Sequence, residues 1–406
     1  MKILLINLTL GRGSTGKIVQ GITKQALANG DEVFVVYGYY DRREPGSYCV
    51  QGGNINTVRR DLLRIRITGY NGFSNKRKTK KVLDLIDSIK PDVIHLHNIH
   101  GGYIQVEYLF EYIKKNNIPV VWTLHDCWAF TGRCAYFSIA KCSKWKKGCF
   151  DCHNSAEYPG FCLFDRSKEQ WARKKEAFCN VAEMVLVTPS YWLAGLVKES
   201  FLKEYEVRTI YNGIDTDVFA FVESDIKQQL GLSGKKIILG VSNTWDARKG
   251  LDDLIELSEV LDDSFKIVVV GHIKDKRRKD KIINLPRMEN QNKLAELYSA
   301  ADVFVNPSRE ETLGMTTIEA MSCGTPVITY NLTAVSEPVS EGCGIVLDYD
   351  ENKNIDNLKS AILKMTSARN EFNKSCRDRV VSMFGEKERF CEYVNLYHKM
   401  LDGETI

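Results

Sequence analysis

Short apolar runs alternate along this chain with longer stretches whose apolar residues recur at helical spacing. A strand that is covered on both faces of a parallel sheet is apolar throughout, so we interpret each short run as a buried parallel strand. The first half contains such runs at Lys2–Ile6, Glu32–Tyr37, Asp92–Leu96, Pro119–Leu124 and Met184–Val187. Helical patterns separate most of them, for example at Ile18–Ala28 and Thr79–Ile89.

The second half repeats this alternation. Its predicted strands are Lys236–Val241, Lys266–Val270, Asp302–Val305, Pro326–Thr329 and Gly344–Leu347. Its predicted helices are Leu251–Leu261, Asn292–Ser299 and Ile355–Ser367. Alternating strands and helices favour doubly wound parallel sheets. Because 406 residues are too many for one ordinary core, we predict an α/β protein with two Rossmann-like domains and a cleft between them.

The predicted boundary between the domains lies between the two sets of strands. We place the first domain at residues 1–205 and the second at 206–386, with a hinge near Tyr191–Val207. The last segment, 387–406, has an aromatic, helical pattern over Glu388–Leu401. We expect this helix to cross back and pack on the first domain.

Composition and charge exclude little beyond the extreme classes. A net charge of +4 is slight for this length and does not require a nucleic-acid partner. No apolar run approaches the roughly 18–20 residues of a spanning helix. The first residues, Met1–Leu8, have the pattern of a strand and not of a signal peptide. We therefore expect a cytoplasmic protein, at most bound at the inner face of the cytoplasmic membrane.

Two carboxylates bracket a loop-to-helix junction in the second domain. Glu311 falls in the loop after the strand Asp302–Val305, and Glu319 falls on the helix that Gly324 ends. In an open parallel sheet, ligands bind beyond the carboxyl ends of the strands. Carboxylates at that place can accept hydrogen bonds from sugar or ribose hydroxyl groups.

A basic loop precedes another helix of the same domain. The strand Lys236–Val241 is followed by a loop that ends in Arg248, Lys249 and Gly250. Amide groups at a helix N-terminus favour phosphate, and an adjacent lysine adds a full positive charge. The alternative interpretation of this loop is a solvated basic surface.

The first strand leads into a glycine-rich turn, Gly11–Lys17, that matches most of a Walker A loop. Its next residue is Ile18, where that motif needs Ser or Thr to hold magnesium. A P-loop phosphotransferase is therefore a weak alternative. Otherwise, such a turn before a helix lets the backbone approach a phosphate or a sugar closely. The candidate residues are Gly13, Ser14, Thr15 and Gly16.

Four of the seven histidines lie between His95 and His125, after two neighbouring predicted strands. A histidine on an apolar strand is more often a satisfied core residue, which is the alternative for His95 and His97. We favour a functional role for His125, and we expect the adjacent Asp126 to orient it or to raise its pKa.

Seven of the twelve cysteines lie between Cys127 and Cys179, which we interpret as a local insertion. Four of them have the spacing C-x7-C-x6-C-x2-C, with His153 adjacent, and these are Cys134, Cys142, Cys149 and Cys152. The terminal C-x2-C fits one edge of a tetrahedral zinc site, and four thiolates would make it structural. Free, partly buried thiols are the alternative.

The motifs of the second half occur in a particular order. The segment Tyr211–Phe219 comes first, then Lys249, then Ala295–Ser308, which leads into Glu311 and Glu319. Together they resemble the retaining glycosyltransferases of family 4 over nearly the whole second half. The resemblance implies a GT-B fold, a nucleotide-diphosphate sugar such as a UDP- or GDP-sugar as donor, and transfer with retention of the anomeric configuration.

The resemblance also implies roles for single residues. Lys249 binds the diphosphate, Glu311 contacts the donor sugar and Glu319 binds the ribose, with Gly314 between them on the donor side. In the first domain, it places His125 toward the acceptor or the donor sugar. In GT-B enzymes the glycine-rich loop faces the donor.

One departure from the family pattern concerns the phosphate-binding arginine. The family usually has an arginine directly after the glycine that ends the strand before the lysine loop, whereas this chain has Val241, Ser242 and Asn243 after Gly240. Either Asn243 occupies the arginine position or Arg248 replaces it from the loop. A lysine and a helix N-terminus at the diphosphate make a divalent metal unnecessary, so we expect activity without a catalytic metal.

A subset of the family that acts in surface-polysaccharide assembly has a similar cysteine-rich insertion after a stretch like Trp122–Asp126. The resemblance therefore favours a glycan or lipid-linked saccharide as acceptor. A basic run over residues 59–81 has one acidic residue, Asp61. Such a run is usually a solvated face, and the alternative that we favour here is docking on an anionic membrane that carries a lipid-diphosphate acceptor. The alternatives are a sugar-binding protein on this fold without catalysis, the P-loop phosphotransferase and, less favoured, a nucleotide-sugar epimerase.

Overall fold

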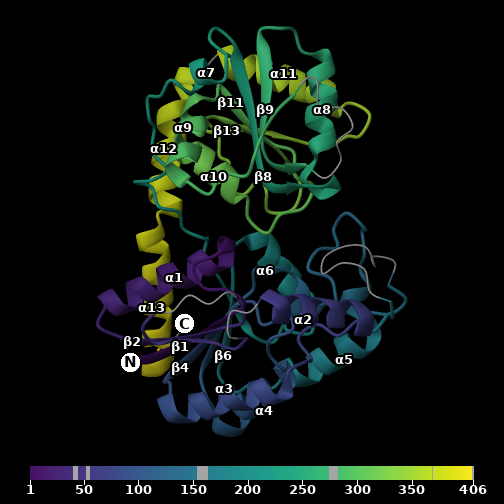
Figure 1. The fold of residues 1–406 in the computed structure, drawn as a ribbon, viewed down its shortest axis with the longest axis vertical. Helices are drawn as coiled ribbons and strands as arrows, with labels where there is room; N and C mark the ends of the chain where they lie inside the picture. Colours follow the sequence, from purple (N-terminus) through teal and green to yellow (C-terminus); the bar gives the residue numbers. More distant parts are fainter. Residues whose placement is uncertain (40–43, 52–54, 153–162, 274–281, 368, 405–406) are drawn as a thin grey trace. The chain divides into compact units, whose positions relative to one another are not determined.

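The computed structural model describes the chain except residues 40–43, 52–54, 153–162, 274–281, 368 and 405–406 (Figure 1). The chain divides into two compact units. Unit 1 comprises Met1–Ile210 and Arg389–Ile406, and unit 2 comprises Tyr211–Glu388. The segment expected as a hinge instead holds helix α6 (Tyr191–Lys198), inside unit 1. Its seryl N-cap and buried apolar face make it an ordinary packed helix.

Unit 1 contains one parallel sheet with the strand order β3-β2-β1-β4-β5-β6-β7. The strands are β1 (Lys2–Asn7), β2 (Glu32–Tyr37), β3 (Ser47–Cys49), β4 (Val93–Leu96), β5 (Val120–Thr123), β6 (Met184–Thr188) and β7 (Glu206–Thr209). Side chains alternate across β1, so that Ile3 and Leu5 enter one core while Leu4 and Ile6 enter the other. Both faces of the sheet are therefore covered.

Two sets of helices cover these faces. One face packs against α1 (Gly13–Ala28) and α13 (Glu386–Asp402). The opposite face packs against α2 (Ile55–Thr68), α3 (Lys76–Ile89), α4 (Val106–Asn116), α5 (Ser167–Phe178) and α6. The segment Arg389–Ile406 belongs to unit 1, and its Phe390, Tyr393 and Tyr397 are buried in the same core as β1.

Unit 2 repeats the plan with the strand order β10-β9-β8-β11-β12-β13. The strands are β8 (Lys236–Trp245), β9 (Phe265–Ile273), β10 (Ile282–Leu285), β11 (Val303–Asn306), β12 (Val327–Tyr330) and β13 (Gly344–Leu347). Helices α7 (Ile226–Gln229), α9 (Gln291–Ala300), α10 (Met315–Ser322) and α12 (Arg369–Phe384) share one core. Helices α8 (Leu251–Val260) and α11 (Asn354–Ser367) share the core on the opposite face.

Both sheets reverse their direction of growth at a switch point. In unit 1 it lies between β1 and β4, and in unit 2 between β8 and β11. The loops that leave these strand pairs diverge to opposite faces, which opens a crevice at the carboxyl edge of the sheet. The glycine-rich turn follows β1, His97 follows β4, Lys249 follows β8 and Glu311 follows β11.

Among the described residues, no helix combines the length and the apolar character that crossing a membrane requires.

Candidate functional site

The two loops at the switch point of unit 2 bring Lys249 and Glu311 together. The Nζ atom of Lys249 forms an ion pair with Oε1 of Glu311. Both side chains are largely buried, with exposed fractions of 18% and 15%. Because a charge in a partly desolvated place is poorly screened, each of the two side chains would interact strongly with a ligand that separates the pair. The structure therefore places the two residues that were predicted to bind the donor at one point.

A short 3₁₀ helix, Ala247–Lys249, sets the position of Lys249. The carboxylate of Asp246 accepts a hydrogen bond from the Lys249 amide at 3.2 Å. Gly250 then turns the chain into α8 with φ of 68°, and a Cβ atom there would lie 2.2 Å from the carbonyl oxygen of Pro307. Only glycine fits this contact, so it fixes the loop after β8 against the loop after β11.

Arg248 and Arg309 strengthen the contact between these loops. The Arg309 amide donates to the Arg248 carbonyl at 2.9 Å, and Nη1 of Arg248 donates to the carbonyl of Glu310 at 3.0 Å. The Arg309 guanidinium donates at 2.9 Å to Asp253, a buried carboxylate on α8. Burial raises the pKa of Asp253, which the neighbouring Tyr330 hydroxyl and Arg309 partly offset. Neither Arg309 nor Asp253 was predicted from the sequence as a site residue.

The other predicted donor ligands lie around α10. Gly314 occupies the N-cap position of this helix. Glu319 is half-buried on α10 and accepts a hydrogen bond from the Tyr298 hydroxyl at 2.9 Å. Asn243 is exposed in the irregular part of β8 between Val241 and Thr244. Arg248 instead is half-buried and lies in the same loop as Lys249, which makes it the better placed of the two for a phosphate.

In unit 1, the glycine-rich turn forms the start of α1. Gly13, Ser14, Thr15 and Gly16 make its first turn, where amide groups lack partners within the helix. A Cβ atom on Gly16 would lie 2.8 Å from the Thr9 hydroxyl, so glycine is needed for the turn to fold back on itself. Asn7, at the end of β1, donates to the Thr9 carbonyl at 2.7 Å and holds this turn at the sheet edge.

A chain of buried side chains runs from helix α13 to His125. The Tyr397 hydroxyl lies 2.6 Å from Nδ1 of His95, whose ring packs against His97 with centroids 4.0 Å apart. Nδ1 of His97 lies 2.9 Å from Nε2 of His125. Nε2 of His95 lies 2.8 Å from the Thr123 hydroxyl. The orientation of His125 thus depends on residues from β4, β5 and the far end of the chain.

Burial keeps these imidazoles neutral. It lowers the pKa of His125 to about 4, because the favourable charge of Asp126 does not compensate for desolvation. The expected rise of the His125 pKa is therefore wrong. The Asp126 carboxylate turns instead to His100, 3.0 Å away, and to the amide of Trp128. Nε2 of His97 is buried and has no hydrogen-bond partner among the described residues, which is unusual for a buried polar atom.

Three of the four predicted zinc ligands, Cys134, Cys142 and Cys149, pack against the core of unit 1, and none of the four is paired in a disulfide. Cys142 and Cys152 lie close enough to Cys149 for their charges to interact, and burial raises the pKa of Cys149 to about 11. Its Sγ atom accepts a hydrogen bond from the Gly132 amide at 3.0 Å. In the part of the chain that the structure describes, no group of three or more Cys, His, Asp or Glu side chains could hold a metal ion.

His153 and Cys162 lie outside the described residues. Structural zinc therefore stays a prediction that metal analysis can test.

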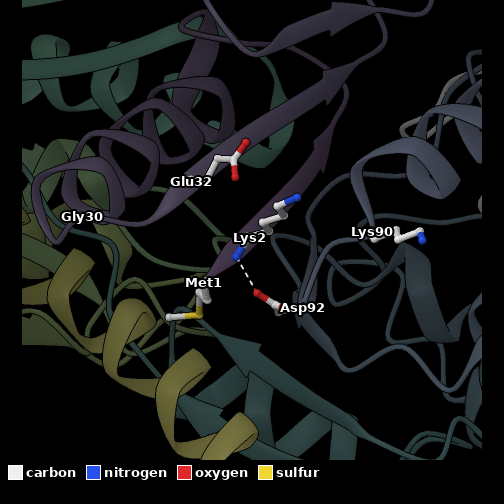
Figure 2. Close-up of a pocket in the computed structure, with 6 residues that line it drawn as sticks. All are labelled: Met1, Lys2, Gly30, Glu32, Lys90 and Asp92. Carbon is white, nitrogen blue, oxygen red and sulfur yellow. Dashed lines mark hydrogen bonds between the residues drawn. The ribbon is translucent and has the colours of Figure 1, made fainter.

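A shallow pocket lies at the opposite edge of the unit 1 sheet, at the start of β1 (Figure 2). Six residues line it, namely Met1, Lys2, Gly30, Glu32, Lys90 and Asp92. Asp92 already accepts a hydrogen bond from the Lys2 amide at 2.6 Å (Figure 2). Because this is the amino edge of a parallel sheet, it lies away from the strand ends at which ligands bind in such folds.

Comparison with known proteins agrees with this geometry. Residues 15–218 match the model of Glycosyltransferase Family 4, and residues 222–379 match that of Glycosyl transferases group 1. The chain belongs to glycosyltransferase family 4. It is a glycosyltransferase, and its two sheets with flanking helices form the GT-B fold, as predicted from the sequence. The weak match to a Walker A loop is accordingly part of a glycosyltransferase and not of a phosphotransferase.

Among relatives of this family 4 enzyme, the colanic acid biosynthesis glycosyl transferase WcaC of Escherichia coli K12 is 25% identical over 98% of the chain and 100% of the relative. An Escherichia coli galactosyltransferase named for a UDP-Gal donor and a GlcNAc-diphosphoundecaprenol acceptor is 26% identical over 50% of the chain and 57% of the relative. HepE of Anabaena, solved with UDP, has a TM-score of 0.68 at 16% identity and covers 98% of this chain and 100% of its own.

Proposed function

We propose that this glycosyltransferase moves a sugar from a nucleotide-diphosphate sugar, with a UDP- or GDP-sugar as donor, to a hydroxyl group of a glycan or lipid-linked saccharide. We further propose that it acts in surface-polysaccharide biosynthesis and retains the anomeric configuration. The observation that carries the donor assignment is the ion pair of Lys249 and Glu311 at the switch point of unit 2. The similarity to WcaC and to the diphosphoundecaprenol galactosyltransferase supports the acceptor class.

The ion pair offers a simple account of donor binding. Without a ligand, the Lys249 ammonium is satisfied by the Glu311 carboxylate. A diphosphate brings a larger negative charge, and the start of α8 adds its positive end. Lys249 would therefore transfer to the diphosphate, and Glu311 would become available to accept hydrogen bonds from the sugar hydroxyl groups.

The proposed transfer step breaks the bond between the anomeric carbon and the phosphate oxygen. A bond then forms between that carbon and the acceptor oxygen, and the departing phosphate takes the acceptor proton. Lys249 and helix amides stabilise the charge that develops on the leaving group, where removal of one such contact costs about 10²–10³-fold in rate. Arg248 lies in the same loop and could share this role.

His125 would act in this scheme as a neutral residue. With a pKa of about 4, it carries no charge near pH 7. It can orient a hydroxyl group through a hydrogen bond, but it does not serve as an imidazolium acid at that pH. Its bond to His97 fixes the ring for this role.

A thermal-shift screen against UDP- and GDP-sugars tests the donor assignment. A ligand that binds only the folded protein raises the melting temperature once its concentration exceeds its dissociation constant. We expect the shift to be lost in Glu319→Ala and kept in Tyr298→Phe, which removes only the partner of that carboxylate. Absence of a shift with every nucleotide sugar would contradict the proposal, and binding without turnover would support a sugar-binding protein instead.

A transfer assay with a lipid-diphosphate-linked saccharide tests the acceptor assignment. We expect transfer to that acceptor in preference to a free monosaccharide, and we expect the product to keep the anomeric configuration of the donor. An inverted product would contradict the retaining mechanism without affecting the donor assignment.

A further inference from the structure

Helix α2 places apolar side chains on its outer face. Leu63 and Ile67 are 57% and 45% exposed, and they lie one turn apart on the same stripe of the helix. The face toward the core is formed by Val58, Asp61 and Ile65, which are buried. Two large aliphatic side chains on the solvent face of a surface helix are the reverse of ordinary amphipathic patterning.

Arginines flank this apolar stripe on both sides. Helical spacing places Arg60 and Arg64 along one side of it and Arg59 and Arg66 along the other, and all four are exposed. The only acidic residue of α2 is Asp61, which is buried on the inner face. The outer face therefore combines an apolar centre with positively charged margins.

The apolar stripe continues onto a second segment of the chain. The Leu163 amide donates to the Arg66 carbonyl at 3.0 Å, so this segment lies at the end of α2. Leu163 and Phe164 are 61% and 56% exposed. Arg166 lies beside them, with its guanidinium 6.0 Å from the Phe164 ring and 3.7 Å from Glu169. We refer to the exposed residues of α2 together with Leu163 and Phe164 as the α2 surface.

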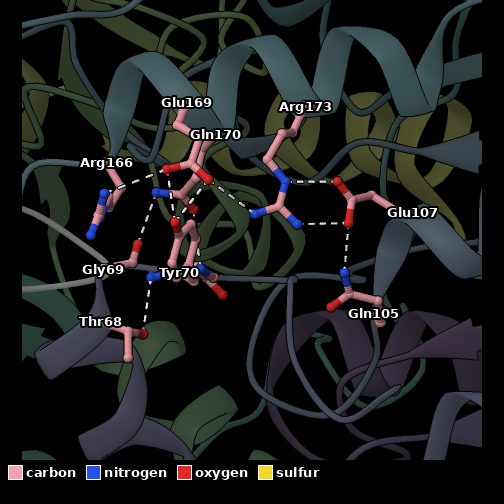
Figure 3. Close-up of polar contacts among 10 residues, drawn as sticks. Thr68, Gly69, Tyr70, Gln105, Glu107, Arg166, Glu169, Gln170 and Arg173 are labelled. Atoms are coloured by element: carbon pink, nitrogen blue, oxygen red, sulfur yellow. Dashed lines mark hydrogen bonds and ion pairs between the residues drawn. The ribbon is translucent and has the colours of Figure 1, made fainter. Parts of the chain in front are cut away.

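Polar contacts fix the base of the α2 surface to its own unit (Figure 3). Gln170 on α5 donates to the carbonyl of Gly69 at 2.8 Å, directly after α2. The Tyr70 hydroxyl donates to the Glu169 carboxylate, and Arg173 forms two hydrogen bonds of 2.7 Å with Glu107 on α4 (Figure 3). The end of α2 is therefore held in place, and the exposed apolar side chains are a built feature of a well-anchored surface.

We propose that the α2 surface docks on an anionic phospholipid membrane. Exposed apolar side chains enter the boundary between headgroups and acyl chains in such an arrangement, and flanking arginines contact the lipid phosphates while their stems lie along the apolar surface. Each basic residue near an anionic membrane strengthens binding about fivefold. The four arginines of α2 supply the electrostatic attraction, and the five exposed apolar side chains, Leu62, Leu63, Ile67, Leu163 and Phe164, supply the apolar contact.

A second copy of the chain fits this surface poorly. A two-fold symmetric interface would place the same patch against itself, and the arginines of one copy would meet those of the other. Burying such like charges is unfavourable unless carboxylates pair with them, and the acidic residue of α2 faces the core. The charge pattern therefore favours a negatively charged partner surface.

Within the basic run of residues 59–81, the structure favours α2 over α3 as the membrane-docking segment. Lys78 of α3 is directed to the Gln51 side chain, and Lys76 lies over the Tyr108 ring. Those two lysines have partners within unit 1, whereas the α2 surface combines charge with exposed apolar area. The docking site is accordingly centred on α2, with the exposed Arg77, Lys80 and Lys81 of α3 as additional positive charge.

Flotation of the full chain with vesicles tests the proposal, and it does not depend on any glycosyl transfer. One set of vesicles contains equal parts of phosphatidylglycerol and phosphatidylcholine, and the other contains phosphatidylcholine alone. We expect binding to the mixed vesicles only, weakening as salt is added. Arg60→Gln with Arg64→Gln should reduce binding about 20-fold, and Leu63→Gln with Ile67→Gln about tenfold or more.

Matched controls come from an exposed helix of unit 2. Leu363 of α11 is 46% exposed and is followed by the exposed Lys364. Leu363→Gln and Lys364→Gln should leave binding unchanged, and each variant should keep the melting temperature of the parent. Equal binding to both kinds of vesicle, or parent-like binding by both α2 variants, would overturn the proposal. The parent could also fail to bind vesicles and form a dimer that the double variant Leu63→Gln with Ile67→Gln does not form. That result would overturn the proposal and identify a self-association surface instead.

Discussion

Lys249 and Glu311, 62 residues apart in the sequence, form an ion pair where the loops after two adjacent strands of unit 2 meet. The sequence analysis predicted that both residues bind one donor. Their pairing in the structure places opposite charges within the region where a diphosphate and a sugar would bind.

Removing either charge should suppress turnover more than it suppresses folding. We expect Lys249→Ala and Glu311→Ala each to reduce kcat/KM by about 10²-fold or more, the scale of one lost transition-state contact. Lys293→Met serves as the control, because this lysine on α9 only pairs with its helix neighbour Glu296. Near-parental rates in both site variants would remove Lys249 and Glu311 from the donor site.

Gly250→Ala should disturb the donor loop through a steric clash. The added Cβ would lie 2.2 Å from the Pro307 carbonyl oxygen, so the two loops must separate. Gly231→Ala is a matched control, because Gly231 has the same φ of 68° but no atom within 4 Å of the added Cβ. Positive φ alone costs about 1 kcal/mol, and we expect Gly250→Ala to cost about 2 kcal/mol more and to weaken donor binding. Equal melting temperatures for the two variants would contradict this explanation of Gly250.

Acidification should destabilise unit 1 through its buried histidines. The pKa of His125 is about 4 in the folded protein against an ordinary value of 6.5, so the unfolded chain binds more protons between these values. Stability should therefore fall as the pH drops from about 6.5 to about 4, by about 1–3 kcal/mol for His125. Melting temperatures of the parent and of His125→Gln, measured between pH 6.5 and pH 4, test this prediction. We expect the melting temperature of the variant to fall less steeply with pH than that of the parent. Parallel curves would show that His125 does not titrate in this way.

Tyr397→Phe should weaken the positioning of the His125 ring, because Tyr397 is linked to that ring through His95 and His97. The substitution removes the hydroxyl group that lies 2.6 Å from His95, at the start of the chain that leads to His125. We expect a loss of about 1–2 kcal/mol in stability, and a shift in the pH profile of turnover that a simple loss of packing would not cause. Tyr48→Phe changes an exposed tyrosine of the same unit and should have neither effect.

Metal removal separates catalysis from the cysteine-rich segment. We expect full activity in EDTA, because the proposed leaving-group contacts come from Lys249 and helix amides. Elemental analysis of the purified protein tests structural zinc, with about one equivalent expected if the cysteines bind it and a loss on Cys149→Ser with Cys152→Ser. Purified protein without zinc would contradict the prediction of a structural zinc site.

The sequence predicted the central strands well because their chemistry is simple. A strand buried on both faces must be apolar along its length, as Val120–Thr123 and Val327–Tyr330 are. The missed strands β3, β7 and β10 all lie at sheet edges. Edge strands are only half covered: β3 and β7 alternate between exposed and half-buried residues, and β10 is a four-residue strand interrupted by Asn284, so no long apolar run marks them.

The candidate site was predictable only where a motif has a local cause. Lys249 and Glu311 were found because each follows a buried strand. The contacts between Arg309 and Asp253, and between Tyr397 and His95, join distant segments through the tertiary fold. No local spacing marks such pairs. The lowered pKa of His125 also follows from burial in the tertiary fold. The sequence shows only the adjacent Asp126, whose charge alone would raise that pKa.

Because Arg389–Ile406 belongs to unit 1, that unit is interrupted by the whole of unit 2. During synthesis, unit 2 is complete before the aromatic residues Phe390, Tyr393 and Tyr397 leave the ribosome. Until α13 is synthesised, the face of the unit 1 sheet that packs against α13 keeps part of its apolar surface exposed. A chain truncated before residue 389 should therefore hold a complete unit 2 beside a unit 1 whose apolar surface is partly uncovered, which is the kind of surface that chaperones bind.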